Sequence, residues 1–139
     1  MTREVHGFDD DEELFRRFTE QELDGDAVME SAIQLQGTSV ERGRFATVAQ
    51  VMQRATIPEQ KFCGVVRNNE LPVGIEVPGG AVFDFYAEDL PEEGDWHAEI
   101  RHRAQGKNFD RSKPKSSNSR STLKRQLARR FRVLPGISR

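Results

Sequence analysis

Histidine, glutamate and arginine alternate in the stretch WHAEIRHR, and these are the side chains that could transfer protons. Residues two apart share one face of a strand, so His97, Glu99 and Arg101 would point the same way. A histidine oriented by a carboxylate could serve in RNA cleavage or another hydrolysis, with the arginine stabilising an anion. A pocket in which Ser39 and Arg42 also converged would favour this alternative. The same alternation is typical of a solvent-facing strand, and we favour that interpretation.

Metal and cofactor chemistry find little support in the sequence. His97 and His102 lie five residues apart, which places them on opposite faces of the expected strand. No Cys/His group has zinc-ligand spacing, no glycine-rich loop matches a nucleotide cradle, and no serine lies in a nucleophile elbow. The acidic runs DDDEE and DLPEEGD lack the ordered ligand alternation of a calcium loop. We therefore expect no metal and no cofactor.

Charge is partitioned along the chain, although the formal net charge is only −2. Residues 1–100 hold 22 acidic and 8 basic side chains, a net charge of −14. Residues 101–139 hold 1 acidic and 13 basic side chains, a net charge of +12. Such asymmetry between the two parts of a chain indicates an interaction surface or tail.

The basic C-terminal segment could neutralise the phosphates of a nucleic acid. It carries one large aromatic residue before the final helix, Phe109, and no RNA-binding signature, so binding would follow backbone charge and not base sequence. Two alternatives stay open: an acidic partner protein, and pairing with this chain's own acids at 9–30 or 88–95. The leading hypothesis is a binding module, not an enzyme, that engages a polyanion or an acidic protein. The candidate contact residues are Arg101, Arg103, Lys107, Arg111, Lys113, Lys115, Arg120, Lys124, Arg125, Arg129, Arg130 and Arg132.

Length and composition indicate one globular domain over residues 1–139, with a single modest core. Apolar residues make up 35% and charged residues 32% of the chain, and no apolar run is long enough to span a bilayer. The N-terminus lacks the pattern of a signal peptide, so a cytoplasmic protein that does not contact membranes is expected. Cys63 lies in the apolar run KFCGVV, which favours a buried hydrophobic role. The oligomeric state stays open.

These residues must be positioned by a small set of elements. The acidic start, residues 1–12, is expected to be frayed. LFRRF at 14–18 suits a short helix, with a first edge strand as the competing interpretation. A strand is expected over 28–36 and a charged loop over 39–45.

Thr47 and Gln50 have capping-box spacing, which predicts a helix over 47–55. FCGVV at 62–66 reads as a buried strand, and LPVGIEV at 71–77 as an edge strand or bulge, because it contains proline and glycine. The runs at 82–88 and 96–103 predict a β-hairpin around an acidic loop.

The C-terminal part is expected to be a basic flexible loop or linker over 104–119, followed by a basic amphipathic helix in the segment 120–133. Ser121 or Thr122 would cap this helix over 121–133. The predicted fold is α+β: a small, mostly antiparallel sheet from 28–36, 62–66, 82–88 and 96–103, covered by two helices, one of them C-terminal and basic. Its predicted core comprises Ile33, Val51, Val65, Phe83, Phe85, Ile100, Leu123, Leu127 and Phe131.

Five short motifs carry a resemblance to other proteins: LFRRF (14–18), SVER (39–42), GVV (64–66), DLPEEGDWHAEI (89–100) and LARRF (127–131). In this order they resemble a loose set of small uncharacterised bacterial proteins that share an arginine pair near the start, a Ser-x-x-Arg segment, a Leu-Pro-acidic turn before His-Ala, and a C-terminal basic helix. The stretch LPVGIEVPGG departs from that pattern. The resemblance implies a bacterial cytosolic protein that is one component of a multi-protein system, and it carries over no functional residue.

Overall fold

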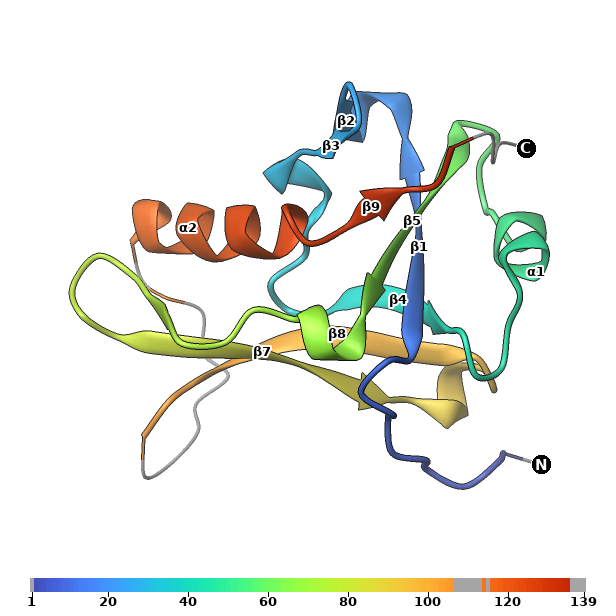
Figure 1. Cartoon of the computed structure of the whole chain (residues 1–139), viewed down its shortest axis with the longest axis horizontal. Coiled ribbons are helices and arrows are strands. Elements are labelled where there is room, and N and C mark those ends of the chain that lie inside the picture. Colours follow the sequence, from blue (N-terminus) through green and yellow to red (C-terminus); the bar gives the residue numbers. More distant parts are fainter. Residues whose placement is uncertain (1, 107–113, 115, 136–139) are drawn as a thin grey trace.

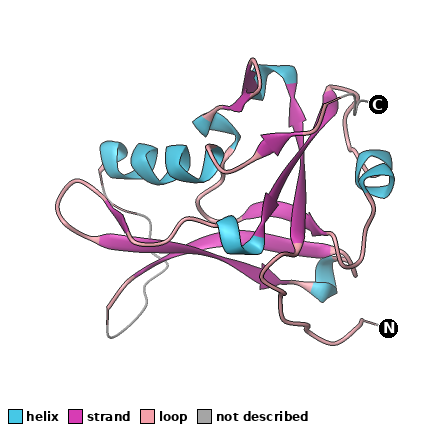
Figure 2. Cartoon of the chain, viewed as in Figure 1, coloured by secondary structure: helices cyan, strands magenta, loops and turns pink. Residues whose placement is uncertain are grey.

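A computed structural model describes residues 2–106, 114 and 116–135, and strands make up most of its regular structure (Figure 2). The strands are β1 (Glu13–Thr19), β2 (Leu23–Asp24), β3 (Ala27–Val28), β4 (Thr38–Arg42), β5 (Gln60–Arg67), β6 (Ile75–Glu76), β7 (Val82–Asp89), β8 (His97–Ala104) and β9 (Arg132–Val133). The α-helices are α1 (Val48–Gln53) and α2 (Ser117–Ala128). Short 3-10 turns lie at η1 (Glu20–Glu22), η2 (Glu30–Ala32), η3 (Asn68–Glu70) and η4 (Pro91–Glu93).

Within the described residues, seven strands form one sheet in the order β6-β7-β8-β4-β1-β5-β9, and every pairing in it is antiparallel. The sheet is strongly curled, so that β1 and β5 stand at a steep angle to β7 and β8 (Figure 1). Strands β2 and β3 form a separate small hairpin. The prediction of a mostly antiparallel α+β structure with two helices is confirmed.

Apolar residues gather in two clusters, because β1 carries apolar side chains on both of its faces. Leu14 and Phe18 lie in the larger cluster with buried residues of α2, whereas Phe15 lies in the smaller one with buried residues of α1. All nine residues of the predicted core are buried, although Val51 and Val65 belong to the smaller cluster.

Cys63 is fully buried in the smaller cluster, as its apolar surroundings in the sequence predict. Burial raises the pKa of its thiol to about 12. The thiolate, which is the reactive form, is therefore suppressed at neutral pH.

The helix expected over 14–18 is wrong, because this segment is the central strand β1, paired with β4 on one side and β5 on the other. The competing interpretation as a strand is right, but β1 does not lie at an edge. The spacing of Leu14 and Phe18 suits either structure, and Phe15 decides it: only in a strand can Phe15 turn away from them and enter the other cluster.

Two further expectations in the N-terminal half are wrong. The predicted strand over 28–36 reduces to β3, and the chain then forms the 3-10 turn η2. Its apolar residues Ile33 and Leu35 are still buried, so packing and not strand pairing accounts for the pattern. The predicted loop over 39–45 contains β4, whose charged residue Arg42 is buried in an ion-pair network.

Several predicted elements are confirmed. Helix α1 follows Thr47, whose hydroxyl accepts a hydrogen bond from Gln50 N–H (3.2 Å), while the Gln50 side chain accepts one from Thr47 N–H (2.9 Å). The hairpin of β7 and β8 pairs in register from Phe83↔Ala104 to Asp89↔Ala98. The strand at 62–66 lies within β5, and β6 is an edge strand.

The C-terminal helix is shifted relative to its prediction. It spans Ser117–Ala128 with Ser116 as N-cap, so it starts before the expected cap at Ser121 or Thr122 and ends before 133. The chain then turns and forms β9, which pairs with Gly64 and Val65 of β5. The apolar side chains repeat every four residues through this turn, which explains why the sequence suggested a longer helix. Half of the expected linker at 104–119 lies outside the described residues; of the rest, Ala104 belongs to β8 and residues 117–119 belong to α2.

Candidate functional sites: a cationic surface and a polar pocket

Five basic side chains form what we call the C-terminal cationic surface. They are Lys124, Arg125, Arg129, Arg130 and Arg132, from the second half of α2, the following turn and β9. The four arginines are exposed and Lys124 is partly so. Within the described part of the chain, none of the five has a carboxylate oxygen within 4.0 Å. Their charge is therefore available to another molecule.

The helix that carries this surface is fixed to the body. Leu123 and Leu127 are fully buried, and Phe131 packs edge to face on Phe18 at 5.4 Å between ring centroids. Polar contacts add to this anchoring: the Ser119 hydroxyl donates to Pro78 O (3.0 Å), and the Ser121 hydroxyl donates to Glu30 Oε2 (2.5 Å). The cations are thus presented by an ordered scaffold.

The other predicted contact residues divide into two groups. Arg101 binds Glu88 and Glu99 of its own chain, Arg103 stacks on the Tyr86 ring at 4.4 Å, and Arg120 donates to Pro114 O. Pairing with the chain's own acids thus occurs at Arg101. The remaining four lie outside the described residues: Lys107, Arg111, Lys113 and Lys115.

The predicted faces of β8 are confirmed. His97, Glu99 and Arg101 lie on the partly exposed face, and His102 is buried on the other face with Nδ1 2.9 Å from Leu35 O. Burial lowers the pKa of Arg101, but hydrogen bonding to Glu99 and the charges of Glu88 and Glu99 outweigh it and raise the pKa. An arginine held between two carboxylates is poorly placed to stabilise an additional anion, so this face gives the catalytic alternative little support.

A polar pocket of about 260 Å³ opens where β1 and β4 separate. These strands pair only at Leu14↔Arg42 and Phe15↔Glu41. Beyond that point the pocket is lined by Phe15, Arg16, Arg17, Glu22, Ser39, Val40, Glu41, Gln60, Trp96 and His97. The pocket holds Ser39 and His97 of the catalytic alternative, but not Glu99, Arg101 or Arg42.

The charges in this pocket are mostly compensated. Glu41 accepts from Arg17 Nη1 (2.5 Å) and from Arg54 Nε (2.8 Å), and the Arg54 guanidinium stacks on the Trp96 ring at 3.9 Å. Arg16 donates to the Ser39 carbonyl (2.7 Å), and burial lowers its pKa. The pocket therefore suits a small polar molecule more than a polyanion. The sequence does not predict this pocket, because LFRRF suits a short helix or an edge strand there; the two adjacent arginines in an apolar run are the signal that could have pointed to it.

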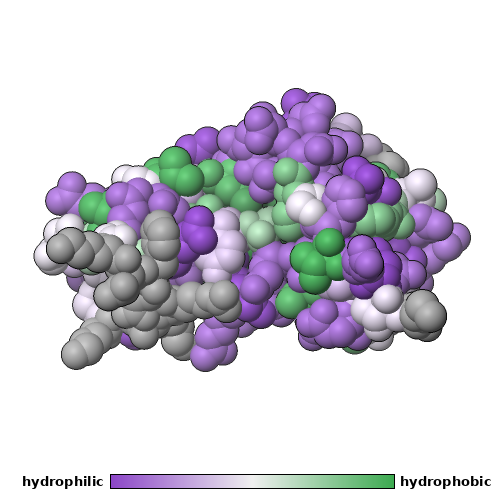
Figure 3. Space-filling model, turned by 90° about the horizontal axis from the view of Figure 1, so that it is seen from below, coloured by the Kyte–Doolittle hydropathy of each residue, from purple (hydrophilic) through white to green (hydrophobic). Residues whose placement is uncertain are grey.

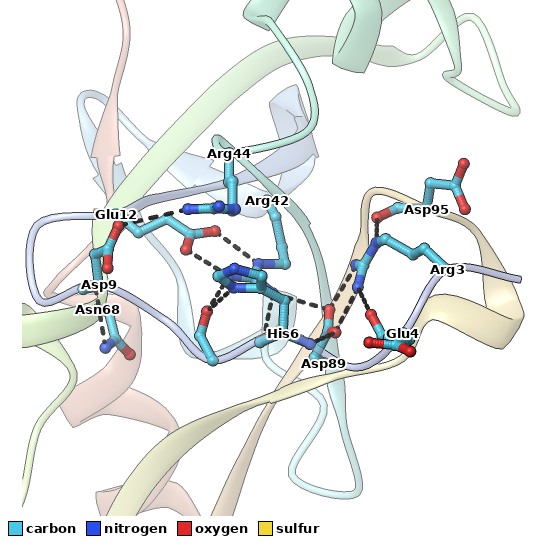
Figure 4. Close-up of polar contacts among 11 residues, drawn as sticks. Arg3, Glu4, His6, Asp9, Glu12, Arg42, Arg44, Asn68, Asp89 and Asp95 are labelled. Carbon is cyan, nitrogen blue, oxygen red and sulfur yellow. Dashed lines mark hydrogen bonds and ion pairs between the residues drawn. The ribbon is translucent and has the colours of Figure 1, made fainter.

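A buried ion-pair network ties the N-terminal segment to the sheet (Figure 4). The Arg42 side chain is inaccessible to solvent and donates to Glu12 through Nε (2.7 Å) and Nη2 (2.6 Å), with Asp89 at 3.0 Å. It also donates to the carbonyls of His6 (2.7 Å) and Gly7 (2.8 Å). Residues 1–12 are expected from the sequence to be frayed, yet in the structure Glu12 and the 6–7 backbone complete the coordination of Arg42. This network is structural.

Asp89 makes the network sensitive to acid. Burial raises the pKa of its carboxyl, but hydrogen bonds from Arg3, the His6 N–H and Arg42 outweigh burial and lower the pKa to about 2. Because the pKa is depressed in the folded state, the stabilisation is complete above the unfolded value near 4 and is lost as the pH falls toward 2.

We expect Asp89→Asn to reduce the free energy of unfolding by about 2 kcal/mol at neutral pH and to flatten its decline between about pH 4 and 2. Urea unfolding at several pH values measures both effects. The exposed residue Asp95 provides the matched control, Asp95→Asn. Parallel stability curves for the wild type and Asp89→Asn across this range would contradict the assignment.

The surface offers no evident apolar docking area on the face in Figure 3, which is mainly hydrophilic with small separate apolar patches. The exposed large apolar residues among those described are Val5, Met29, Ile57 and Val73, scattered over different elements. In the described part of the chain, no helix has the length and apolar character needed to cross a membrane. No family model, curated protein or solved structure matches the chain.

Proposed function

We propose that this protein is a non-enzymatic binding module that engages the phosphate backbone of a nucleic acid through its C-terminal cationic surface. The observation that carries the proposal is a group of five exposed or partly exposed cations that have no acidic partner among the described residues. They lie on the second half of α2, the following turn and β9, a segment anchored in the core by Leu123, Leu127 and Phe131. Arginine supplies four of the five, and its planar guanidinium matches the geometry of phosphate oxygens.

The acidic body supports the same proposal by restricting how a polyanion can approach. The first 100 residues carry a net charge of −14, which repels phosphates from most of the molecule. Residues 117–135 contain six basic side chains and no acidic one, so attraction is concentrated on one region. Contact would therefore be oriented by the charge separation within the protein, without any reading of the base sequence.

The test is fluorescence polarisation with a labelled 20-base-pair duplex of arbitrary sequence, titrated with the full chain at several salt concentrations. If the five cations neutralise about five phosphates, the logarithm of affinity should fall against the logarithm of salt with a slope of roughly −4 to −5. The double variant Arg129→Gln/Arg130→Gln should weaken binding and reduce the steepness of this slope by about 2.

The matched control removes two exposed cations from the acidic body, Arg44→Gln/Lys61→Gln, and so has the same net charge as the first double variant. It should bind almost as tightly as wild type. Equal losses in both double variants would show that net charge alone matters, which overturns the assigned surface. Truncation after residue 104 is a poorer test, because it removes the buried residues Leu123 and Leu127.

The experiment must also distinguish a nucleic acid from an acidic partner protein as the ligand of this surface. Chains that bind polyglutamate but not duplex DNA or single-stranded RNA at low salt would overturn the nucleic-acid proposal and assign the surface to acidic proteins. Nucleic-acid binding that is insensitive to salt would also overturn it, because the proposed contacts are purely electrostatic.

A further inference from the structure

Three potential metal ligands meet at the start of β8, far along the sheet from α2 (Figure 1). The ligand atoms of Glu93, His97 and Glu99 all lie within 4.8 Å of one another. His97 and Glu99 are two residues apart on one face of the strand, and the 3-10 turn η4 brings Glu93 back beside them. Oxygen and imidazole nitrogen atoms at such separations can converge on one ion after small rotations of the side chains.

The backbone and neighbouring side chains position this group. The η4 turn is closed by hydrogen bonds from Gly94 N–H to Pro91 O (3.2 Å) and from His97 N–H to Gly94 O (2.9 Å). Glu99 is held on one side by Arg101, which donates to Oε1 from Nε (3.0 Å) and Nη2 (2.7 Å). On the other side, a Cβ built at Gly37 would come within 2.4 Å of the same oxygen, so a larger residue at position 37 would displace the end of the Glu99 side chain.

The low solvent exposure of two of the ligands and the sparse hydrogen bonding of the His97 ring also favour a bound ion. The side chains of His97 and Glu99 are only 19% and 17% exposed, although Glu93 is 52% exposed. His97 Nε2 lies 3.5 Å from Glu93 Oε2, and in the described part of the chain its ring makes no hydrogen bond shorter than this contact. A neutral imidazole carries a lone pair on one of its two nitrogens, which is the atom that can bind a metal ion.

The local charge balance fits a divalent cation. The two carboxylate ligands, Glu93 and Glu99, carry two negative charges; Glu99 also pairs with Arg101, and Glu93 contacts the His97 ring. A divalent ion would neutralise them. Because one ligand is an imidazole, the set suits Zn²⁺, Mn²⁺ or Co²⁺ better than Ca²⁺, which takes more oxygen ligands.

We propose that Glu93, His97 and Glu99 form a binding site for a divalent transition-metal ion. Three protein ligands leave at least one coordination position for water or another small ligand, and His97 also lines the polar pocket between β1 and β4. A metal here would therefore lie beside the entrance to that pocket. The site is separate from the C-terminal cationic surface, and either assignment can fail without the other.

The test uses the full chain after treatment with a chelator, titrated with Zn²⁺ by calorimetry and with Co²⁺ by visible absorption. We expect wild type to bind one ion per chain. His97→Ala and Glu99→Gln should each lower the affinity at least about tenfold, because loss even of a group that only orients a ligand typically costs that much. Arg101→Gln should have the opposite effect and tighten binding roughly tenfold, because it removes a positive charge next to the ion.

His6 gives the matched control, since its ring is exposed, lies 2.8 Å from Gly7 O and is not one of the three proposed ligands. His6→Gln should bind Zn²⁺ as wild type does. Urea unfolding of each variant without metal checks that the fold persists. Loss of binding in His6→Gln, equal binding by His97→Ala and wild type, or no binding at metal concentrations up to the millimolar range would each overturn the proposal.

Discussion

Replacing Arg42 by methionine is expected to reduce the free energy of unfolding by about 3–5 kcal/mol. Methionine fills much of the same volume but leaves the carboxylates of Glu12 and Asp89 in the protein without their shared cation. The carbonyls of His6 and Gly7 also lose their donors. Removal of one partner from a buried ion network is costly because the remaining charges stay desolvated. Equilibrium unfolding in urea measures the loss.

Arg44→Met is the control for this substitution. Arg44 is 43% exposed, and its contact with Asp9 is long, at 3.8 Å. Its loss should change stability by less than about 1 kcal/mol. A second comparison adds Glu12→Gln to Arg42→Met, which should recover part of the loss because one uncompensated charge disappears. Unchanged stability of Arg42→Met would mean that water reaches the network and that its charges are not buried.

The second large effect is expected at Phe18, and it should depend on Gly64. Phe18 is fully buried and packs on Phe131, so Phe18→Ala should cost about 3–5 kcal/mol. A Cβ at position 64 would lie 2.3 Å from Phe18 Cε2, so Gly64→Ala should destabilise the wild type by about 1–3 kcal/mol through overpacking. In the Phe18→Ala background the added methyl would instead occupy the vacated space.

The double variant Phe18→Ala/Gly64→Ala is therefore expected to be at least as stable as Phe18→Ala alone. Urea unfolding of the wild type, both single variants and the double variant completes the thermodynamic cycle. Additive losses would show that the ring and the glycine do not share this space. Leu71→Ala tests a buried residue of the same cluster and should not respond to Gly64→Ala.

The parts of the fold that could be predicted from the sequence are those in which local chemistry and long-range packing agree. Thr47 and Gln50 cap α1 through contacts three residues apart, and the β7–β8 hairpin joins neighbouring strands. Apolar positions such as Phe83 and Ile100 are buried as their alternation indicates. The sequence predicts a C-terminal helix, but over residues that lie too far along the chain, because Phe131 continues the apolar repeat after the helix has ended.

The errors arise where distant segments decide the local structure. Arg42 looks like a loop residue until Glu12, Asp89 and the 6–7 backbone surround it, and none of these is near it in sequence. LFRRF becomes a strand because β4 and β5 provide partners on both sides. Helical and strand periodicity cannot be separated over five residues with this composition.

The candidate sites also combine features that the local sequence predicts with features that depend on distant segments. The cationic residues of the C-terminal segment were predictable from charge alone, but their freedom from acidic partners depends on tertiary structure. Arg101, part of the same segment in sequence, is held by Glu88 across the hairpin. The approach of Glu93 to His97 depends on the η4 turn, which the acidic loop DLPEEGD did not reveal.

The position of β9 has a consequence for synthesis of the protein on the ribosome. β9 contributes only two residues, yet it covers the outer edge of β5, whose FCGVV run is apolar. During translation, β5 is complete long before residues 132–133 leave the exit tunnel. The nascent chain therefore exposes an apolar strand edge, a template for aggregation, until residues 132–133 can pair with it. Arg132 is itself one of the two pairing residues, and Arg129 and Arg130 lie just before it, so the segment that closes this edge also supplies charge that discourages association with other strands.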